Sequence, residues 1–212
     1  MTGGPAPSLL LVRHGRTEAN ARGLLLGRAD PALDALGRRQ ADAAAAALSS
    51  DRFGPVRTIV SSPLRRAVQT AEAIGEQVHA EVVLDERLIE LDYGDWEGRP
   101  LTDVPAESWA RWRADPTVGP PGGESLATLG ARVRSACEQL SGELVGPAAV
   151  VVVSHVSPIK AAAAWALGVG DEVAWRTQLD NASISRVLVR SAGPALGLFN
   201  ETAHLAGLSA DR

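Results

Sequence analysis

The chain has 212 residues, of which 45% are hydrophobic and 22% are charged, a composition that fits a globular domain and excludes disordered and fibrous proteins. Its formal net charge of −4, from 25 acidic and 21 basic residues, argues against a nucleic-acid-binding surface and a polybasic membrane anchor. Lys160 is the only lysine, so almost all of the positive charge is carried by arginine.

The sequence also bears on location. Cys137 is the only cysteine, so no intramolecular disulfide can form, which fits a reducing cytoplasm. The first residues, MTGGPAPS, lack a charged region, and the apolar run LLLV is too short for a secretory signal. No apolar run approaches the length of a membrane span. We therefore expect a cytoplasmic protein without a membrane segment.

In the first half of the chain, apolar strands alternate with helical segments, at residues 8–13, 36–48, 57–62, 64–78 and 82–84. The helix over 36–48 is rich in alanine, and Asp34 stands where it can cap that helix. Pro63 ends the strand over 57–62, and the apolar residues of the helix over 64–78 fall on one face.

An irregular stretch over residues 92–123 interrupts this alternation. It contains Trp96, Trp109 and Trp112 and ends in the turn-rich sequence PTVGPPGG. We expect this stretch to form a cap insertion with a short helix near residues 107–114. Its tryptophans can either form the packed interior of the cap or line an apolar wall for the leaving group of a substrate.

Helices and strands resume after the insertion, at residues 123–140, 148–154, 158–167, 183–190 and 195–200. Continuous apolar strands separated by helices predict a largely parallel sheet with helices on both faces. The alternating pattern of residues 184–190 predicts a more exposed, antiparallel edge strand. We therefore predict an α/β fold with a mostly parallel central sheet, helices on both faces and a small cap insertion. We expect a single domain over residues 1–212.

Two histidines and several arginines follow three of the predicted strands. They are Arg13 and His14 after the first strand, Arg65 and Arg66 after the second, and His155 after the strand over 148–154. Ligands bind at the carboxyl ends of the strands in open α/β sheets, so we expect these side chains to meet at one edge.

This combination suits phosphoryl chemistry. An imidazole nitrogen can attack phosphorus and hold the phosphoryl group covalently, and the arginine fork matches phosphate oxygens. The backbone N–H groups around Gly15 could add donors, because glycine allows a close approach of the chain. No glycine-rich nucleotide-binding motif is present. A divalent metal on these histidines is disfavoured by the adjacent arginines, so we expect no metal.

Five stretches carry a family resemblance, in the order LVRHGRTEAN, SSPLRRAVQTA, LIELDYGDWEG, GGESL and VSHVSPIK, with FNETAHL near the C-terminus. They resemble the histidine phosphatase superfamily, which has a three-layer phosphoglycerate mutase-like fold. Within it, the chain is similar to the phosphatase branch that includes α-ribazole phosphatases and broad-specificity acid phosphatases. The resemblance implies a phosphomonoesterase without a cofactor or metal.

The resemblance also implies roles for four residues at the strand ends. His14 would be the nucleophile, and Arg13 would bind the phosphoryl oxygens beside it. Arg66, the arginine before alanine in the SSPLRRA motif, would be the second phosphate ligand. His155 would donate to the transferring phosphoryl group.

Two further roles come from the resemblance alone. Glu90, in the L-x-E pattern of LIELDYG, would protonate the leaving group and then activate water, and Asn20 would hydrogen-bond the phosphate from the side. Two positions depart from the family pattern. Val156 stands where a glycine is usual, although its N–H remains available to phosphate. Arg16 replaces a glutamate or glutamine and makes the mouth of the site more basic.

The expected substrate is a small phosphorylated metabolite, with no nucleic-acid or membrane partner, and a homodimer is compatible with the sequence. A phosphoglycerate mutase-type phosphoryl transferase is the first alternative. Mutases carry a longer insertion after the acid, whereas only residues 91–122 separate Glu90 from Gly123. A non-catalytic phosphate-binding protein is the second alternative. His79 and His204 are expected to be structural or surface residues.

Overall fold

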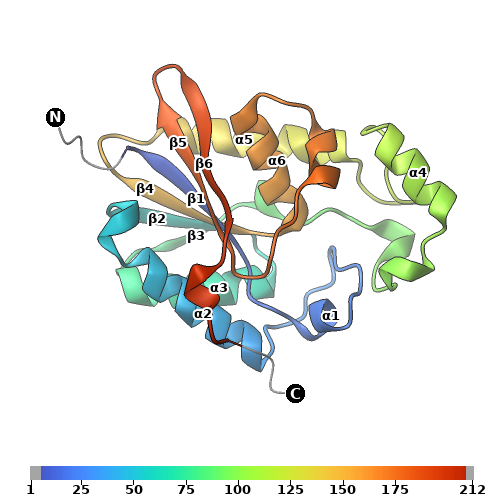
Figure 1. Ribbon diagram of the computed structural model, residues 1–212, viewed down its shortest axis with the longest axis horizontal. Coiled ribbons are helices and arrows are strands. Elements are labelled where there is room, and N and C mark those ends of the chain that lie inside the picture. Colours follow the sequence, from blue (N-terminus) through green and yellow to red (C-terminus); the bar gives the residue numbers. More distant parts are fainter. Residues whose placement is uncertain (1–5, 209–212) are drawn as a thin grey trace.

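The computed structural model describes residues 6–208, which surround a six-stranded sheet of order β3-β2-β4-β1-β5-β6 (Figure 1). The strands are β1 (Ser8–Arg13), β2 (Val56–Ser61), β3 (Val82–Leu84), β4 (Ala149–Ser154), β5 (Ile184–Arg190) and β6 (Gly193–Glu201). The first four run parallel, whereas β5 pairs antiparallel with β1, and β6 pairs antiparallel with β5. The predicted α/β fold with a mostly parallel sheet is confirmed.

One detail of the prediction is wrong. The strand over 184–190 was expected at the edge of the sheet, but β5 lies between β1 and β6, and β6 forms the edge. Its antiparallel direction is as predicted. An alternating pattern shows only that one face of a strand is covered. It does not distinguish an edge strand from a strand inside the sheet, which is why the prediction of the edge failed.

The helices are α1 (Glu18–Ala21), α2 (Ala35–Leu48), α3 (Arg65–Val78), α4 (Ala106–Ala114), α5 (Leu126–Gly142) and α6 (Val156–Leu167). Short 3₁₀ turns are η1 (Asp51–Phe53), η2 (Glu86–Leu88), η3 (Gly94–Trp96), η4 (Leu101–Asp103), η5 (Asp171–Arg176) and η6 (Ala203–Leu205). Asp34 caps α2 as predicted, because its side chain accepts from the N–H of Gly37 at 2.7 Å.

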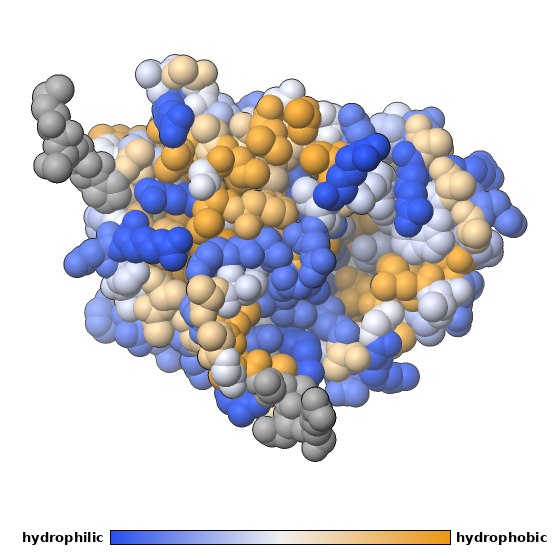
Figure 2. Space-filling model, viewed as in Figure 1, coloured by the Kyte–Doolittle hydropathy of each residue, from blue (hydrophilic) through white to orange (hydrophobic). Residues whose placement is uncertain are grey.

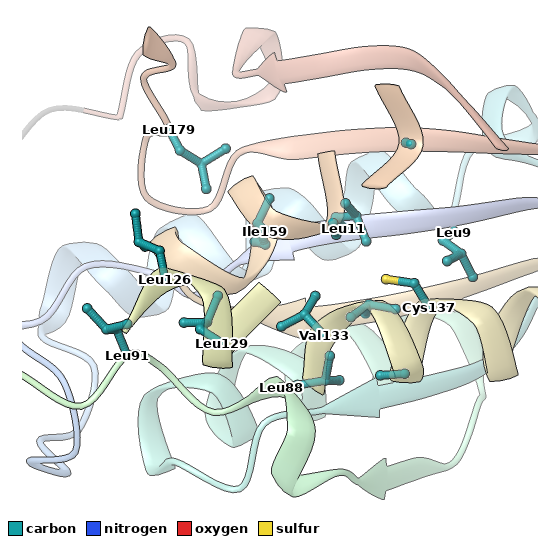
Figure 3. Packing of buried hydrophobic residues seen from close by; sticks show 14 of the residues in the cluster. Leu9, Leu11, Leu88, Leu91, Leu126, Leu129, Val133, Cys137, Ile159 and Leu179 are labelled. Atoms are coloured by element: carbon teal, nitrogen blue, oxygen red, sulfur yellow. The ribbon is translucent and has the colours of Figure 1, made fainter. Parts of the chain in front are cut away.

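Helices cover both faces of the sheet. Leu10 and Val12 of β1 pack with side chains of α2 and α3, whereas Leu9 and Leu11 pack with side chains of α5 and α6 (Figure 3). The alternation follows from the period of two along a strand. Cys137 of α5 lies in the second of these layers, and burial raises the pKa of its thiol to about 12. It is therefore a packed, un-ionised thiol.

The stretch over residues 92–123 folds into η3, η4 and α4, which lie at the right-hand end of the molecule in Figure 1. Trp96 and Trp112 are only 6% and 2% exposed, and both belong to the same core cluster as Leu9 and Leu11. The insertion is therefore packed onto the body of the protein.

No helix within residues 6–208 is long and apolar enough to cross a membrane. On the surface, apolar side chains gather over β6 and α6 (Figure 2). Leu167 at the end of α6 and Val169 just after it are 49% and 45% exposed. The homodimer stays a prediction.

Candidate active site

Neighbouring strands bring the predicted site residues to one edge of the sheet. β1 ends at Arg13 and is followed by His14, and β4 ends at Ser154 and is followed by His155. The backbone N–H of His14 donates to the carbonyl oxygen of Ser154 at 3.0 Å, and the two imidazole centroids lie 5.0 Å apart. Arg66 comes from the first turn of α3, just after β2. The structure thus brings both histidines and both arginines of the motifs together.

His14 is held in one tautomer. Its ring is buried, and Nδ1 lies 2.7 Å from the carbonyl oxygen of Gly15. A carbonyl oxygen can only accept, so Nδ1 carries the proton and Nε2 keeps its lone pair. Burial lowers the pKa of His14 well below its usual range, and the positive charges of Arg66 and Arg13 lower it further. The ring is therefore a neutral nucleophile at neutral pH.

Arg66 lies between the two histidines and is fully buried. Its Nε is 3.3 Å from Nε2 of His14 and 3.2 Å from Nδ1 of His155. Its two terminal nitrogens donate to the carbonyl oxygens of Ala29 and Gly27, at 2.7 and 2.8 Å. Burial lowers the pKa of Arg66, but a guanidinium group stays charged in proteins. The side chain is thus a fixed cation at the centre of the site.

His155 is oriented by Arg66 and Ser62. Nδ1 accepts from Arg66, so in the neutral ring the proton is on Nε2, which lies 2.8 Å from Oγ of Ser62. Burial lowers the pKa of His155 well below its usual range, and Arg66 adds to this effect. Sequence reasoning gave Ser62 no role, although its place in the SSP sequence after β2 is a usable signal.

Arg13 carries a buried donor without an acceptor. Its Nη1 donates to the carbonyl oxygen of Leu179 at 2.6 Å, whereas its buried Nε has no partner. Burial lowers the pKa of Arg13 to about 10, so the group remains charged at neutral pH. Buried donors are almost always paired, and a phosphate oxygen beside His14 would supply the acceptor.

Glu90 caps the N-terminus of α6, directly after His155, and is only 3% exposed. Its Oε2 accepts from the N–H of Val156 at 3.0 Å, and its Oε1 from those of Ser157 and Leu91, at 3.2 and 2.8 Å. A carboxylate is stabilised at this end of a helix. The N–H of Val156, which we expected to remain available to phosphate, donates to Glu90 in the structure, and its binding to phosphate stays a prediction.

The segment after β1 packs against the start of α2. A side chain at Gly15 would overlap the backbone of Gly37, and the N–H of Gly15 donates to Oγ1 of Thr70 at 3.1 Å. The N–H groups around Gly15, which we expected to add donors for phosphate, are bonded within the protein: that of His14 donates to Ser154, and that of Arg16 to Gln40. The glycine is required for contact between two backbone segments. Arg16 pairs with Asp34 at 2.7 Å, which offsets the basic charge that we expected at the mouth of the site.

Asn20 lies in α1 and is linked to the nucleophile through Asn181. Its Oδ1 accepts from the N–H and hydroxyl of Thr17, at 3.1 and 3.0 Å, in a capping box. Nδ2 of Asn181 lies 3.4 Å from that oxygen and 3.3 Å from the carbonyl oxygen of His14. These bonds use the carbonyl half of the amide and leave Nδ2 of Asn20 as the group that can donate.

Arg13 and His14 are held by the loop before β5. The sequence analysis assigned this loop no role. Leu179 accepts from the guanidinium of Arg13, and the N–H of Ala182 donates to the carbonyl oxygen of His14 at 3.1 Å. The N–H of Arg13 donates to the carbonyl oxygen of Ser183 at 3.2 Å. Residues 179–183 therefore fix the position of the nucleophile.

The FNETAHL sequence supports this loop. Asn200 has a φ of 54°, and its amide exchanges two 2.8 Å hydrogen bonds with Asp180. Its donation lowers the pKa of Asp180. Nε2 of His204 lies 2.9 Å from the carbonyl oxygen of Ala182, and His79 is an exposed residue that ends α3. The structural role expected of His204 is thus a specific one, and the motif was the signal for it.

The assembled site combines a neutral imidazole, two guanidinium groups, a second imidazole and a carboxyl group within one buried cluster. Within residues 6–208, no group of three or more His, Cys, Asp or Glu side chains could hold a metal ion. The arrangement can bind a phosphoryl dianion, attack it with nitrogen and exchange a proton with the group that leaves.

Curated proteins with similar sequences include phosphatases. The bifunctional protein Rv2228c of Mycobacterium tuberculosis is 39% identical over 206 residues, which cover 95% of this chain and 56% of that protein. The chain thus spans about half the length of this relative. Phosphoserine phosphatase 1 of Hydrogenobacter thermophilus is 36% identical over 201 residues, 93% of each chain.

Solved structures and a family model agree with these relatives. A phosphoserine phosphatase mutant from Entamoeba histolytica, in complex with phosphoserine, superposes with a TM-score of 0.85 at 29% identity, over 94% of this chain and 99% of that one. The model of the histidine phosphatase superfamily (branch 1) matches residues 9–202. The resemblance is confirmed, and the chain belongs to the histidine phosphatase superfamily.

Proposed function

We propose that this protein is a metal-independent phosphomonoesterase that hydrolyses small phosphate esters through a phosphohistidine at His14. One observation carries the proposal. The carbonyl oxygen of Gly15 holds the Nδ1 proton of His14, so Nε2 is unprotonated and accepts a hydrogen bond from Nε of Arg66, which a phosphate oxygen can take over when substrate binds. A nucleophile and a phosphate-binding cation are therefore in contact before any substrate binds.

In the first step, Nε2 of His14 attacks phosphorus, and the bond between phosphorus and the ester oxygen breaks. Arg13 and Arg66 stabilise the charge on the phosphoryl oxygens. Glu90 is bonded to three N–H groups, an environment that suits a carboxylate, so it needs a proton for this step. We propose that it takes up that proton when the phosphoryl dianion binds beside it and then gives it to the leaving oxygen. The products of this step are the free alcohol and the phosphohistidine.

In the second step, the carboxylate of Glu90 takes a proton from water, and the water oxygen attacks phosphorus. The bond between phosphorus and Nε2 of His14 breaks, which releases inorganic phosphate and restores the neutral imidazole. Glu90 ends this step in its protonated form.

His155 needs a proton before it can donate through Nδ1, because that nitrogen accepts from Arg66 in the structure. A phosphoryl dianion next to the ring favours the protonated form. We therefore propose that His155 takes up a proton when substrate binds and then donates to the transferring group.

The short segment between Glu90 and Gly123 supports hydrolysis over the mutase alternative. The names of the relatives do not separate the two activities, because a probable phosphoglycerate mutase is found among them beside the phosphatases. The second alternative, a binding protein without turnover, has less support because the nucleophile and both arginines are present. We keep the cytoplasm as the proposed location and a small phosphorylated metabolite as the proposed substrate, without nucleic-acid or membrane partners.

The test is release of inorganic phosphate from a panel of phosphomonoesters, from acidic to neutral pH and with a chelator present. Wild type, His14→Ala and the surface control His79→Ala would be compared. We expect chelator-resistant release in wild type and in the control, and loss of turnover in His14→Ala with unchanged thermal unfolding.

Intact-protein mass spectrometry of rapidly quenched wild type should show one added phosphoryl group that is absent from His14→Ala. Turnover retained by His14→Ala would refute the nucleophile. Transfer of phosphate between hydroxyl groups of a bisphosphorylated glycerate, without net release, would favour the mutase. Tight phosphate binding without turnover of any ester would favour the binding protein.

A further inference from the structure

A cavity of about 150 Å³ lies at the N-terminal end of α6, beside the proposed active site. Its walls include the aromatic side chains Tyr93, Trp109, Trp112 and Trp175. Cavities of about this volume hold a molecule the size of benzene, whereas drug-sized ligands need roughly 300 Å³ or more. The cavity therefore fits a small group.

The cavity shares a wall with the proposed acid. Val156 and Ser157 line it, and the backbone N–H groups of the same two residues donate to Glu90. A second link is Tyr93, which also lines the cavity: burial and the charge of Glu90 raise the pKa of its hydroxyl, and the charge of Arg13 lowers it. The cavity therefore lies close to the proposed acid, and we take it as the space for the alcohol part of the substrate.

Lys160 is the cation of this wall. Positions 156, 157 and 160 lie on one face of α6, because residues three and four apart are neighbours on a helix. Nζ of Lys160 donates to the carbonyl oxygen of Ala174 at 2.9 Å, and an ammonium group has three donors in all. The bond to Ala174, which lies in the η5 turn, thus leaves two donors of the ammonium group for a ligand.

No carboxylate within residues 6–208 forms an ion pair with Lys160, although its side chain is partly buried. Charged groups near Nζ are Arg13, which with burial lowers the pKa of Lys160, and Glu90, which raises it. A partly buried ammonium without a carboxylate partner is unusual. An anionic group on a ligand would supply that partner.

The aromatic part of the wall fits the same ligand. The buried indole N–H of Trp112 has no acceptor, and buried donors are almost always paired. The wall therefore offers the apolar surface of its indole rings and one buried indole N–H without an acceptor.

We propose that this cavity binds the alcohol part of the substrate and that Lys160 selects phosphomonoesters whose alcohol carries a carboxylate. The proposal rests on the proposed phosphatase function. It names the substrate class, a small carboxylated phosphate ester, and one specificity-determining residue. Lys160 is the only lysine of the chain and lines this cavity.

The test compares matched esters that differ in the carboxylate: 4-carboxyphenyl phosphate with phenyl phosphate, and 3-phosphoglycerate with glycerol 3-phosphate. Wild type should have the higher kcat/KM for the carboxylated member of at least one pair. Lys160→Met keeps the shape of the side chain and removes its charge. We expect it to lose about tenfold to a hundredfold for the carboxylated ester, mainly through KM.

Activity on the member without a carboxylate should change little in Lys160→Met, which separates recognition of the alcohol from catalysis. Lys160→Gln, which keeps donors, should recover part of the loss, and thermal unfolding of both variants checks the fold. Equal rates on both members of both pairs in wild type, or an unchanged preference in Lys160→Met, would overturn the inference while leaving the phosphatase intact. Absence of turnover on every ester would instead refute the proposed function, and this inference with it.

Discussion

At the level of single residues, the contact between Gly15 and Gly37 constrains where the nucleophile can lie. A Cβ on Gly15 would meet only backbone atoms of Gly37, which cannot rotate away. We expect Gly15→Ala to lower the free energy of unfolding by about 1–3 kcal/mol, as overpacking does elsewhere, and to reduce phosphatase turnover. Urea denaturation and steady-state kinetics measure the two effects.

Gly142 provides a matched control, because a Cβ there meets nothing within 4 Å and the residue ends α5. Gly142→Ala should leave turnover unchanged and keep or slightly raise the free energy of unfolding, by up to about 1 kcal/mol. Equal behaviour of the two alanine variants would show that the backbone contact at Gly15 does not matter.

Arg66 and Arg65 offer a second comparison between neighbours. Lysine at position 66 cannot contact both histidines and both loop carbonyls at once, because its ammonium is a single point on a flexible chain. We expect Arg66→Lys to lower kcat/KM by roughly a hundredfold or more, the scale for loss of one donor to developing charge. Arg65 is exposed, so Arg65→Lys should resemble wild type in the same assay.

Some residues of the candidate site could be predicted from the sequence pattern alone, and others could not. His14 and His155 follow clear apolar strands, so their meeting at one edge follows from topology. Helix periodicity cannot choose between Arg65 and Arg66, and spacing cannot choose Glu90 among the acids around it. Only the family resemblance singled out Arg66 and Glu90. In the structure Arg66 contacts His155, and Glu90 accepts from the first N–H of α6.

At the level of elements, β6 acts on the nucleophile through the loop over residues 179–183. Asn200 of β6 holds Asp180 with two hydrogen bonds, and that loop binds Arg13. Asn200→Gly tolerates the positive φ but removes both bonds. We expect KM for phosphate esters to rise about tenfold, with a smaller fall in kcat, because Arg13 is less well positioned.

Gln178 is the control for this prediction, because its exposed side chain also donates to Asp180, at 3.1 Å. Gln178→Ala should change KM by less than Asn200→Gly does. If Asn200→Gly has wild-type kinetics at a temperature where it is fully folded, the loop does not need β6 to hold Arg13.

The strands and long helices were predictable because their local patterns agree with their tertiary positions. The insertion over residues 92–123 was less so. Its short helix α4 was expected, but the turns around it are fixed by long-range contacts, such as the N–H of Asp95 to the carbonyl oxygen of Pro121 at 2.9 Å. No periodic pattern encodes such contacts, so the cavity beside Lys160 could not be derived from the sequence.

For the whole molecule, the two buried histidines link stability to pH. Their pKa values lie well below 6.5 in the folded protein, so below about pH 6.5 the unfolded chain binds more protons than the folded one. The histidines' contribution to stability is therefore complete above pH 6.5 and declines as the pH falls. The slope approaches ~1.4 kcal/mol per pH unit for each histidine.

Urea denaturation between pH 8 and pH 5 measures this slope. His155→Asn should show a shallower loss of stability toward acid than wild type, whatever its stability at pH 8. The exposed variant His79→Asn should keep the wild-type slope. Parallel curves for wild type and His155→Asn would mean that the buried ring does not resist protonation.

The aromatic cluster has a spectroscopic consequence. Four of the five tryptophans have ring centroids 4.8 to 6.2 Å from a neighbour in one group, Trp96, Trp109, Trp112 and Trp175. Three of them line the cavity, and the fifth, Trp165, lies in α6. Most of the protein's indole fluorophores therefore lie in or beside this cavity, so we expect its occupancy to change the intrinsic fluorescence without any added dye.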